Sequence, residues 1–321
     1  MDRGKKMALI VGCNYPNTPN ELHGCHNDAL AMREVLLTRF GFDPEHVGLL
    51  IDKPDSSIMP TGANIKSALN RMVDRAEQGD ILFFHYSGHG TLIKRHNLSK
   101  REEAIVPCDF NLITTTCVDI RQLVNRVPQG ATFTILSDSC HSGGLIDKEK
   151  EQIGPYTTPN DAVAISHKPK EIPSQSILQY FTSITSKTST DIGTHLVEVF
   201  GHDASLMFRT EPGEPVSKPF LKAGEGILLS GCETNETSAD VENMKNGGKP
   251  CGAFSNAVQM VLKENPGGGL SNREIVVMAR GILSLEHFNK QHPCLYCSDE
   301  NANAIFLGGT KENCRATELL K

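Results

Sequence analysis

Thr132–Gly144 reads TFTILSDSCHSGG, and our expectation for the fold starts from these residues. Its apolar, β-favouring run, Phe133–Leu136, stops abruptly at small and polar residues. Asp80–Tyr86 (DILFFHY) has the same design and is followed by Ser-Gly-His-Gly. Buried parallel strands read as continuous apolar runs, and open α/β sheets place their ligands beyond the carboxyl ends of the strands. If the two strands are neighbours, Cys140 and His89 meet at one edge of the sheet, which is the minimum arrangement for a cysteine nucleophile.

Cys140 has to be distinguished from an ordinary packing cysteine. The chain contains ten cysteines, and free cysteine is among the most buried residue types. Cys140 differs because small and polar residues surround it at a strand end, and because His89 ends another buried run. A thiol with a pKa of about 8.5 is only a few per cent ionised at neutral pH, so His89 would have to take its proton. His141 would point to the opposite face of an extended segment, so we assign it a structural role.

The same edge of the sheet offers groups for binding a substrate. The backbone N–H groups of Gly90 and Cys140 are candidate donors to a tetrahedral oxyanion. Asp138 lies two residues before Cys140, on the same side of an extended strand, and Asp28 opens the first predicted helix. Two carboxylates beside a nucleophile favour a basic substrate residue. For Asp28 alone, a helix N-cap is an equal alternative.

Length and composition limit the class of protein. The chain has 321 residues, of which 38% are hydrophobic and 22% charged, as in ordinary globular proteins. The net charge of −6 provides no footprint for nucleic acid or an anionic membrane. The apolar run near the N-terminus is about six residues, too short for a signal peptide, and no run approaches the ~20 residues of a membrane span. We therefore expect a cytoplasmic protein with reduced thiols and no nucleic-acid or membrane partner, with the nucleus or unconventional release to the extracellular space as alternative locations.

The first part of the chain alternates between apolar runs and helical periodicity. This alternation predicts an α/β fold with parallel strands and right-handed crossovers. Besides the two strands above, the pattern predicts strands at Met7–Gly12 and Val47–Ile51, a strand or hairpin at Glu102–Pro107, and helices at His26–Phe40, Ala63–Gln78 and Asp119–Val127.

The composition changes after Gly144. Asp147–Gly224 is rich in Pro, Ser and Thr, with helical periodicity only around Ser176–Phe181 and Thr194–Phe200. Such a long, weakly periodic span is usually functional or disordered. Regular patterns return as a strand at Gly226–Gly231, helices at Gly252–Leu262 and Ser271–Leu285, and a last strand at Asn303–Leu307.

Two further patterns are weak. Cys294-Leu-Tyr-Cys297 is a lone C-x-x-C, which disfavours a zinc site and leaves a redox-responsive regulator as an alternative function. His85 lies four residues before His89, but this spacing on a strand does not pair the two rings for a metal. We predict no metal site from these residues.

Several motifs together resemble the metacaspases, the caspase-fold cysteine peptidases of plants, fungi and protists. These are VGCNYPNT (Val11–Thr18), ELHGCHND (Glu21–Asp28), HYSGHG (His85–Gly90), EAIVPCDFN (Glu103–Asn111), DSCHSGG (Asp138–Gly144) and HPCLYCSDENA (His292–Ala302). The long insert resembles the plant type II group. His89 and Cys140 lie 51 residues apart, and the corresponding spacing in caspases is roughly 50.

The resemblance implies a caspase-like three-layer sandwich, with a mostly parallel central sheet and helices on both faces. Residues 1–146 would form a large-subunit-like catalytic region, 147–224 a linker insert with an autoprocessing site, and 225–321 a small-subunit-like region that completes the sheet. The implied protein is a latent zymogen that cuts itself in the linker and cleaves after Arg or Lys, never after Asp. The caspase signature Q-A-C-x-G is absent here and D-S-C-H-S-G replaces it, which also argues against Asp specificity.

The resemblance also assigns residues. The dyad falls on His89 and Cys140, and the pocket for the basic residue falls on Cys25, Asp28, Ser87 and Asp138. Lys170 in HKPKEIPS lines up with the processing site. Lys168 is a poorer site because Pro169 follows it, and Lys187 is an alternative.

Many metacaspases require calcium, and a calcium site needs several carboxylates. Gly90–Arg101 contains Lys94, Arg95, Lys100 and Arg101 and no acidic residue, so we expect no cofactor and no calcium requirement. The expected partners are protein or peptide substrates with Arg or Lys at the cut, and protein inhibitors. We expect a monomer with a role in plant cell death or stress. The alternative function is a catalytically silent binding or scaffold protein with the caspase fold.

Overall fold

The computed structural model describes residues 4–94, 101–114, 119–142, 151–154, 167–210, 226–233, 235–242, 248–266, 269–288 and 290–308. A seven-stranded sheet runs through this described part, in the order β2-β1-β3-β7-β10-β13-β8. The first five strands in that order are parallel to one another, and β13 and β8 are antiparallel to their neighbours. The strands are β1 (Lys6–Gly12), β2 (Val47–Ile51), β3 (Ile81–Ser87), β7 (Thr132–Asp138), β8 (Glu151–Ile153), β10 (Gly226–Ser230) and β13 (Cys294–Tyr296).

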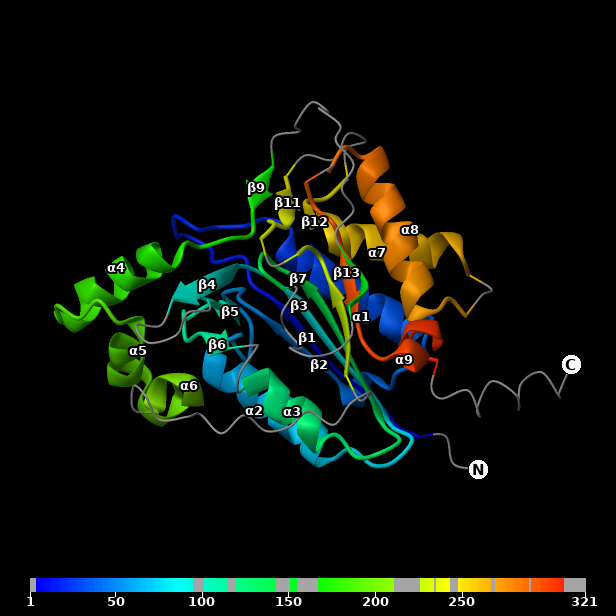
Figure 1. Ribbon diagram of the computed structural model, residues 1–321, viewed down its shortest axis with the longest axis horizontal. Helices are drawn as coiled ribbons and strands as arrows, with labels where there is room; N and C mark the ends of the chain where they lie inside the picture. The colour runs from blue at the N-terminus through cyan, green and yellow to red at the C-terminus, as the bar shows by residue number, and fades with distance from the viewer. Residues whose placement is uncertain are drawn as a thin grey trace, which may run out of the picture.

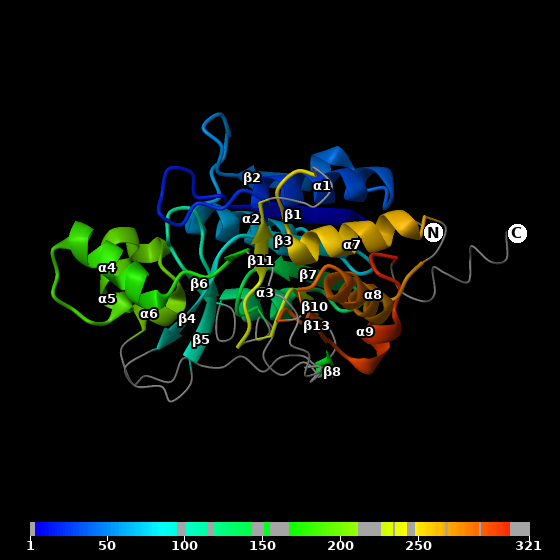
Figure 2. The same cartoon turned by 90° about the horizontal axis from the view of Figure 1, so that it is seen from above.

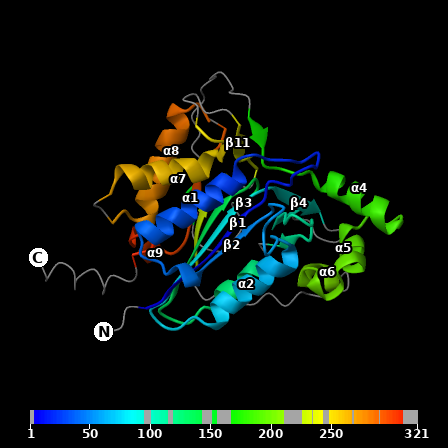
Figure 3. The same ribbon diagram turned by 180° about the vertical axis from the view of Figure 1, so that it is seen from behind.

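Helices cover both faces of this sheet (Figure 1). On one face lie α2 (Gly62–Asp74) and α3 (Asp119–Arg126), and on the other lie α1 (Cys25–Thr38), α7 (Ala253–Glu264) and α8 (Asn272–Leu285). Figure 3 shows the same separation of α2 from α1, α7 and α8 from behind. Leu9 and Val11 belong to one apolar cluster and Ala8 and Ile10 to the other, so each buried strand supplies both layers. This explains the unbroken apolar runs, and the expected three-layer α/β sandwich is confirmed.

Two smaller sheets lie beside the central one. A hairpin and a short strand form an antiparallel sheet of β4 (Gly90–Lys94), β5 (Arg101–Ile105) and β6 (Ile113–Thr114). Beside it lie α4 (Ser174–Thr185), α5 (Ile192–Phe200) and α6 (Leu206–Arg209) (Figure 2). The other sheet joins β9 (Lys168–Pro169), β11 (Ala239–Val241) and β12 (Cys251–Gly252). Short 3-10 turns at Pro44–His46 and Gly201–Asp203 and the helix α9 (Asp299–Asn303) complete the described elements.

Two predicted elements differ from the structure. The helix predicted to reach Gln78 ends at Asp74, because Arg75 and Ala76 close a tight turn onto Val73. The strand predicted at Asn303–Leu307 is wrong: α9 covers its start, and Ile305 forms only an isolated bridge to Ser271. The last strand is β13, within the C-x-x-C segment, and three residues are too few to show a strand period.

Within the predicted linker insert, residues 151–153 join the central sheet as β8, and the helices expected near 176–181 and 194–200 are α4 and α5. No helix in the described part of the chain is both long and apolar enough to cross a membrane.

Candidate active site

β3 and β7 are parallel neighbours, and Ser87 lies opposite Asp138 in their register. The segments that follow the two strands therefore leave the sheet at the same carboxyl edge. His89 and Cys140 both lie in these segments, and each is 1% exposed. The sheet thus places the two residues that the sequence predicts as a dyad at the same edge.

The hydrogen bonds of His89 determine which ring nitrogen can accept a proton. Nε2 lies 2.7 Å from the backbone oxygen of Asn20, which can only accept, so Nε2 carries the hydrogen. Nδ1 is buried without a hydrogen-bond partner among the described residues. Burial lowers the pKa of His89 to about 4, so the ring is neutral at pH 7. His89 Nδ1 is therefore free of hydrogen and can act as a base.

Cys140 contacts a residue that lies 98 positions later in the chain. The backbone N–H of Ser238 donates to Cys140 Sγ at 3.1 Å, and Sγ lies 3.6 Å from the backbone oxygen of Ser238. Burial raises the pKa of Cys140 well above its ordinary value, so the resting form is the thiol. The neutral thiol and neutral imidazole suit a reaction in which the base removes the proton as the sulfur attacks.

Two backbone N–H groups converge on one oxygen. The N–H of Gly90 and the N–H of Cys140 donate to the carbonyl oxygen of Lys170, at 2.9 and 3.3 Å. These are the two donors that the sequence suggests for an oxyanion. A Cβ on Gly90 would overlap the carbonyl of Cys140, so only glycine permits this approach.

The side chain of Lys170 ends among the predicted pocket residues. It is fully buried, and Nζ lies 3.2 Å from Asp138 Oδ2 and 3.5 Å from Asp28 Oδ2. Nζ also donates to Ser87 Oγ at 2.9 Å and to the backbone oxygen of Asp138 at 3.2 Å. The buried thiol of Cys25 interacts electrostatically with the same ammonium group.

The two carboxylates of this pocket differ in charge. Burial alone would raise the pKa of Asp138, but Lys170 and hydrogen bonds from Ser238 and Ser255 outweigh it and lower that pKa. Burial raises the pKa of Asp28 to about 7, although Lys170 opposes the shift. Burial also disfavours the ammonium, but Asp138 and the neighbouring acidic groups keep the pKa of Lys170 well above its ordinary value. The main ion pair is therefore that of Lys170 with Asp138.

Asp28 is not the N-cap of α1. The N-cap residue is Gly24, and Asp28 lies one turn inside the helix with its side chain buried. Its two oxygens accept the N–H of Gly252 at 2.9 Å, and Oδ2 also accepts the hydroxyl of Ser87 at 2.7 Å. The capping alternative is wrong, because the carboxylate faces the pocket rather than the first turn.

Sequence reasoning missed the residues that the small-subunit-like region contributes. Besides Ser238, the N–H of Ser255 donates to Asp138 Oδ2 at 2.9 Å, and a Cβ on Gly252 would enter the space between Lys170 and its carboxylates. Gly252 before a helical pattern was the one available signal. The sequence around Ser238 and Ser255 is ordinary and polar, and it gives no signal of a role in the site.

His141 lies beside the residue that follows Lys170. Its backbone is left-handed, with φ of 55°, and its Nε2 lies 3.1 Å from Glu171 Oε1. His85 is elsewhere: it is buried, its Nε2 lies 3.2 Å from Ser255 Oγ, and burial lowers its pKa to about 3. His85 therefore stays neutral and supports the neighbouring helix start.

The C-x-x-C cysteines do not form a matched pair. Both are buried, and neither forms a disulfide. Cys294 Sγ lies 3.7 Å from Glu233 and 3.8 Å from Arg280, whereas Cys297 belongs to an apolar cluster. Their different surroundings disfavour the redox-regulator alternative.

One group among the described residues could hold a metal ion. It consists of Glu151, Glu233 and Cys294, whose ligand atoms lie within 4.8 Å of one another. A thiol is a poor ligand for calcium, which prefers oxygen ligands. The Arg280 guanidinium beside Cys294 would also repel a cation. The group lies on strands β8 and β13 and the loop after β10, and it includes none of the residues that hold Lys170.

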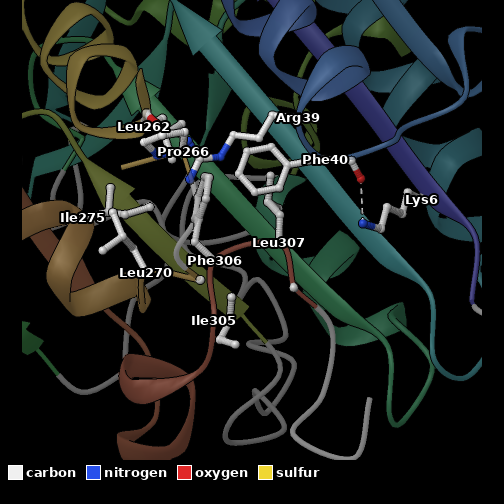
Figure 4. A pocket seen from close by; sticks show the side chains of 12 residues that line it. Lys6, Arg39, Phe40, Leu262, Pro266, Leu270, Ile275, Ile305, Phe306 and Leu307 are labelled. Carbon is white, nitrogen blue, oxygen red and sulfur yellow. Dashed lines mark hydrogen bonds between the residues drawn. The ribbon is translucent and has the colours of Figure 1, made fainter. Parts of the chain in front are cut away.

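A pocket of about 270 Å³ lies at the opposite end of the sheet (Figure 4). Its lining includes Lys6, at the amino end of β1, together with Phe40 and Phe306. Lys6 Nζ donates to the backbone oxygen of Phe40 at 2.7 Å. Because parallel strands end at the other edge, this pocket is separate from the dyad.

Comparisons with known proteins identify the family. The Caspase domain family matches residues 5–304. Metacaspase-9 of Arabidopsis thaliana is 53% identical over 94% of this chain and 97% of its own length, and Metacaspase-6 of the same plant is 35% identical over 94% and 99%. The crystal structure of protein GSU0716 from Geobacter sulfurreducens has a TM-score of 0.60 with 18% identity, covering 96% of this chain and all of that one, which supports the fold alone.

The geometry and these relatives agree on one class of protein. The family match covers nearly all of the described chain, and the relatives align over almost their full length. The chain belongs to the caspase-domain family and, within it, to the plant type II metacaspases, which are cysteine-type endopeptidases.

Proposed function

We propose that this chain is the zymogen of an endopeptidase that cleaves after Lys or Arg, and that it activates itself by cutting between Lys170 and Glu171. One observation carries the proposal: Lys170 lies in the site as a substrate residue would. Its ammonium group lies between Asp28 and Asp138, and its carbonyl oxygen accepts the N–H groups of Gly90 and Cys140.

The backbone on both sides of the bond is also held. Lys168 and Pro169 pair with β11, and the N–H of Lys170 donates to the backbone oxygen of Ser238 at 2.9 Å. On the other side, the N–H of Ile172 donates to the backbone oxygen of Gly90 at 3.1 Å. Such fixed orientation of the reacting groups lowers the entropic cost of the reaction.

The reaction would proceed in two steps. In the first, His89 Nδ1 takes the thiol proton as Cys140 Sγ attacks the carbonyl carbon of Lys170, and the oxyanion is held by the two N–H groups. His89 then returns the proton to the nitrogen of Glu171, the C–N bond breaks, and Lys170 is left as a thioester on Cys140. In the second, His89 takes a proton from water, whose oxygen displaces the sulfur. His89 gives this proton to the departing sulfur, which restores the thiol, and the released Lys170 acid ionises to the carboxylate.

The pocket charge explains the preference for a basic residue. An aspartate side chain entering beside Asp138 would place two carboxylates in a buried space, which costs far more than the lysine ion pair. Arginine and lysine would each satisfy Asp138, and the proton on Asp28 limits the repulsion between the two acids.

The self-processing site is tested by substitution at the cut. Lys170→Ala should slow the appearance of the two fragments by at least about a hundredfold, because it removes a buried ion pair from the transition state. Lys168→Ala is the matched control and should still give a fragment beginning at Glu171, identified by mass spectrometry. Efficient cutting of Lys170→Ala after Lys187 would instead favour the alternative processing site.

The substrate preference is tested with matched peptides that end in Arg, Lys or Asp before the cut. We expect hydrolysis after Arg and Lys, little after Asp, and none in Cys140→Ala. Cleavage after Asp would overturn the pocket assignment. Absence of hydrolysis in both proteins at every pH would favour the silent scaffold.

A cytoplasmic location, a monomeric state, protein inhibitors and a role in plant cell death or stress stay part of this proposal. Fluorescence microscopy and size-exclusion chromatography test the first two directly.

A further inference from the structure

Ser238 contacts the nucleophile, the substrate backbone and the acidic pocket at once. It is fully buried and lies one residue before β11. Its N–H donates to Cys140 Sγ, and its carbonyl oxygen accepts the N–H of Lys170 at 2.9 Å. Its hydroxyl hydrogen-bonds to Asp138 Oδ1. The backbone of Ser238 thus contacts the nucleophile and the residue before the cut bond, and its side chain contacts the pocket.

Gln291 determines the direction of this last hydrogen bond. Its Nε2 donates to Ser238 Oγ and to the backbone oxygen of Gly231, each at 2.9 Å, and its Oε1 accepts the N–H of Ala239 at 3.1 Å. An amide nitrogen can only donate, so the hydroxyl of Ser238 accepts from Gln291 and has its hydrogen available for Asp138. The order of donation is Gln291 to Ser238 to Asp138.

This chain of donors leaves the other oxygen of Asp138 for the substrate. Asp138 Oδ2 accepts the N–H of Ser255 at 2.9 Å and lies 3.2 Å from Lys170 Nζ. With Oδ1 occupied by Ser238, the carboxylate cannot turn away from the ammonium group without losing a buried hydrogen bond. A buried carboxylate oxygen without a donor is strongly unfavourable.

We propose that Ser238 and Gln291 are positioning residues for basic-residue recognition, which they support by orienting Asp138 as an acceptor toward the substrate ammonium. The inference rests on the proposed cleavage after Lys or Arg. Under this proposal the acidic side chains that bind the basic residue belong to the large-subunit-like region. Two residues of the small-subunit-like region contribute to the same specificity.

The test compares kinetics of fully processed Ser238→Ala and Gln291→Glu with the unaltered protein, on peptides with Lys or Met before the cut. For Ser238→Ala we expect KM for the Lys peptide to rise about tenfold and kcat to change less than about twofold, since the backbone groups at Cys140 are kept. The Lys-over-Met ratio of kcat/KM should fall about tenfold. Gln291→Glu should act in the same direction, because a carboxylate accepts the Ser238 hydroxyl and turns it from Asp138.

Gln179→Glu is the matched control, because Gln179 is exposed on α4 and its variant should behave as the unaltered protein. Thermal unfolding of each variant is measured alongside. Unchanged KM and an unchanged Lys-over-Met ratio in both buried variants would overturn the inference. Equal losses on both peptides with a lower Tm would overturn it too, since that pattern indicates a structural role alone. If the unaltered protein shows no preference for Lys, the proposed function itself fails, a result distinct from the other two.

Discussion

A single buried residue, Asp28, makes the charge of the pocket depend on pH. Its carboxyl is fully enclosed, and burial raises its pKa to about 7 despite the nearby Lys170. Asp138, 3.2 Å from the same ammonium, has a lowered pKa because Lys170 and hydrogen bonds from Ser238 and Ser255 outweigh the effect of its burial. The pocket therefore holds one firmly ionised acid and one acid that titrates near neutrality.

The stability of the uncut precursor, studied as Cys140→Ala, should depend on the charge of Asp28. The pKa of Asp28 is higher in the folded protein than in the unfolded chain. The stability that the protonated carboxyl gives to the folded protein is therefore fully present below about pH 4 and is lost as the pH rises toward 7. Adding Asp28→Asn removes this titration. The unfolding free energy of the double variant minus that of its Cys140→Ala parent should therefore increase by a few kcal/mol from pH 4 to pH 7.

Urea unfolding at several pH values measures this difference directly. Other titrating groups, such as the buried His85 and His89, act equally in both proteins and cancel. A difference in unfolding free energy that is flat with pH would show that Asp28 does not titrate in this window.

Among the elements, α4–α6 are held on the β4–β6 sheet by contacts that do not involve the cut bond. Ile177, Phe181 and Leu196 lie in the same apolar cluster as residues of β4 and β5. Thr114 Oγ1 and Ser205 Oγ are 2.9 Å apart, and Asn111 donates to the backbone oxygen of Asp203 at 2.9 Å. These contacts fix the chain that follows Lys170.

We therefore predict that α4 and α5 stay docked after the cut. Their amide hydrogen exchange should be the same in the precursor and the processed protein, because exchange depends on opening of this packed unit. Phe181→Ala provides a sensitive comparison and should accelerate exchange in both forms by removing a buried ring. Much faster exchange after processing of the unaltered protein would show that the helices are released.

The whole molecule should keep its activity when metal ions are removed. The described residues contain one group with metal-ligand spacing, and its thiol and neighbouring arginine make it unsuitable for calcium. We expect incubation with excess chelator to leave peptide hydrolysis within about twofold of the untreated value, since no step of the proposed reaction uses a cation. Complete loss that added calcium restores would contradict this expectation.

Much of the fold was predictable because its signals are local. Apolar runs predicted β1, β2, β3, β7 and β10 at nearly the observed residues, and helical periodicity predicted α1, α3, α7 and α8. β8 and β13 carried too few residues for a period and were not predicted. The strand expected at Asn303–Leu307 failed because an apolar run there packs as an irregular segment against α8.

A thiol and an imidazole at the ends of two buried strands, with acids nearby, could be predicted from the order of the residues alone, because an apolar run and the small residues that end it are neighbours in the chain. What faces these two residues depends on the tertiary fold. Ser238 reaches Cys140 across 98 residues and Gly252 reaches Asp28 across 224. These contacts exist because β10 pairs with β7 and carries the last third of the chain to the same edge. No local pattern encodes such a pairing, since it follows from burying both faces of one sheet.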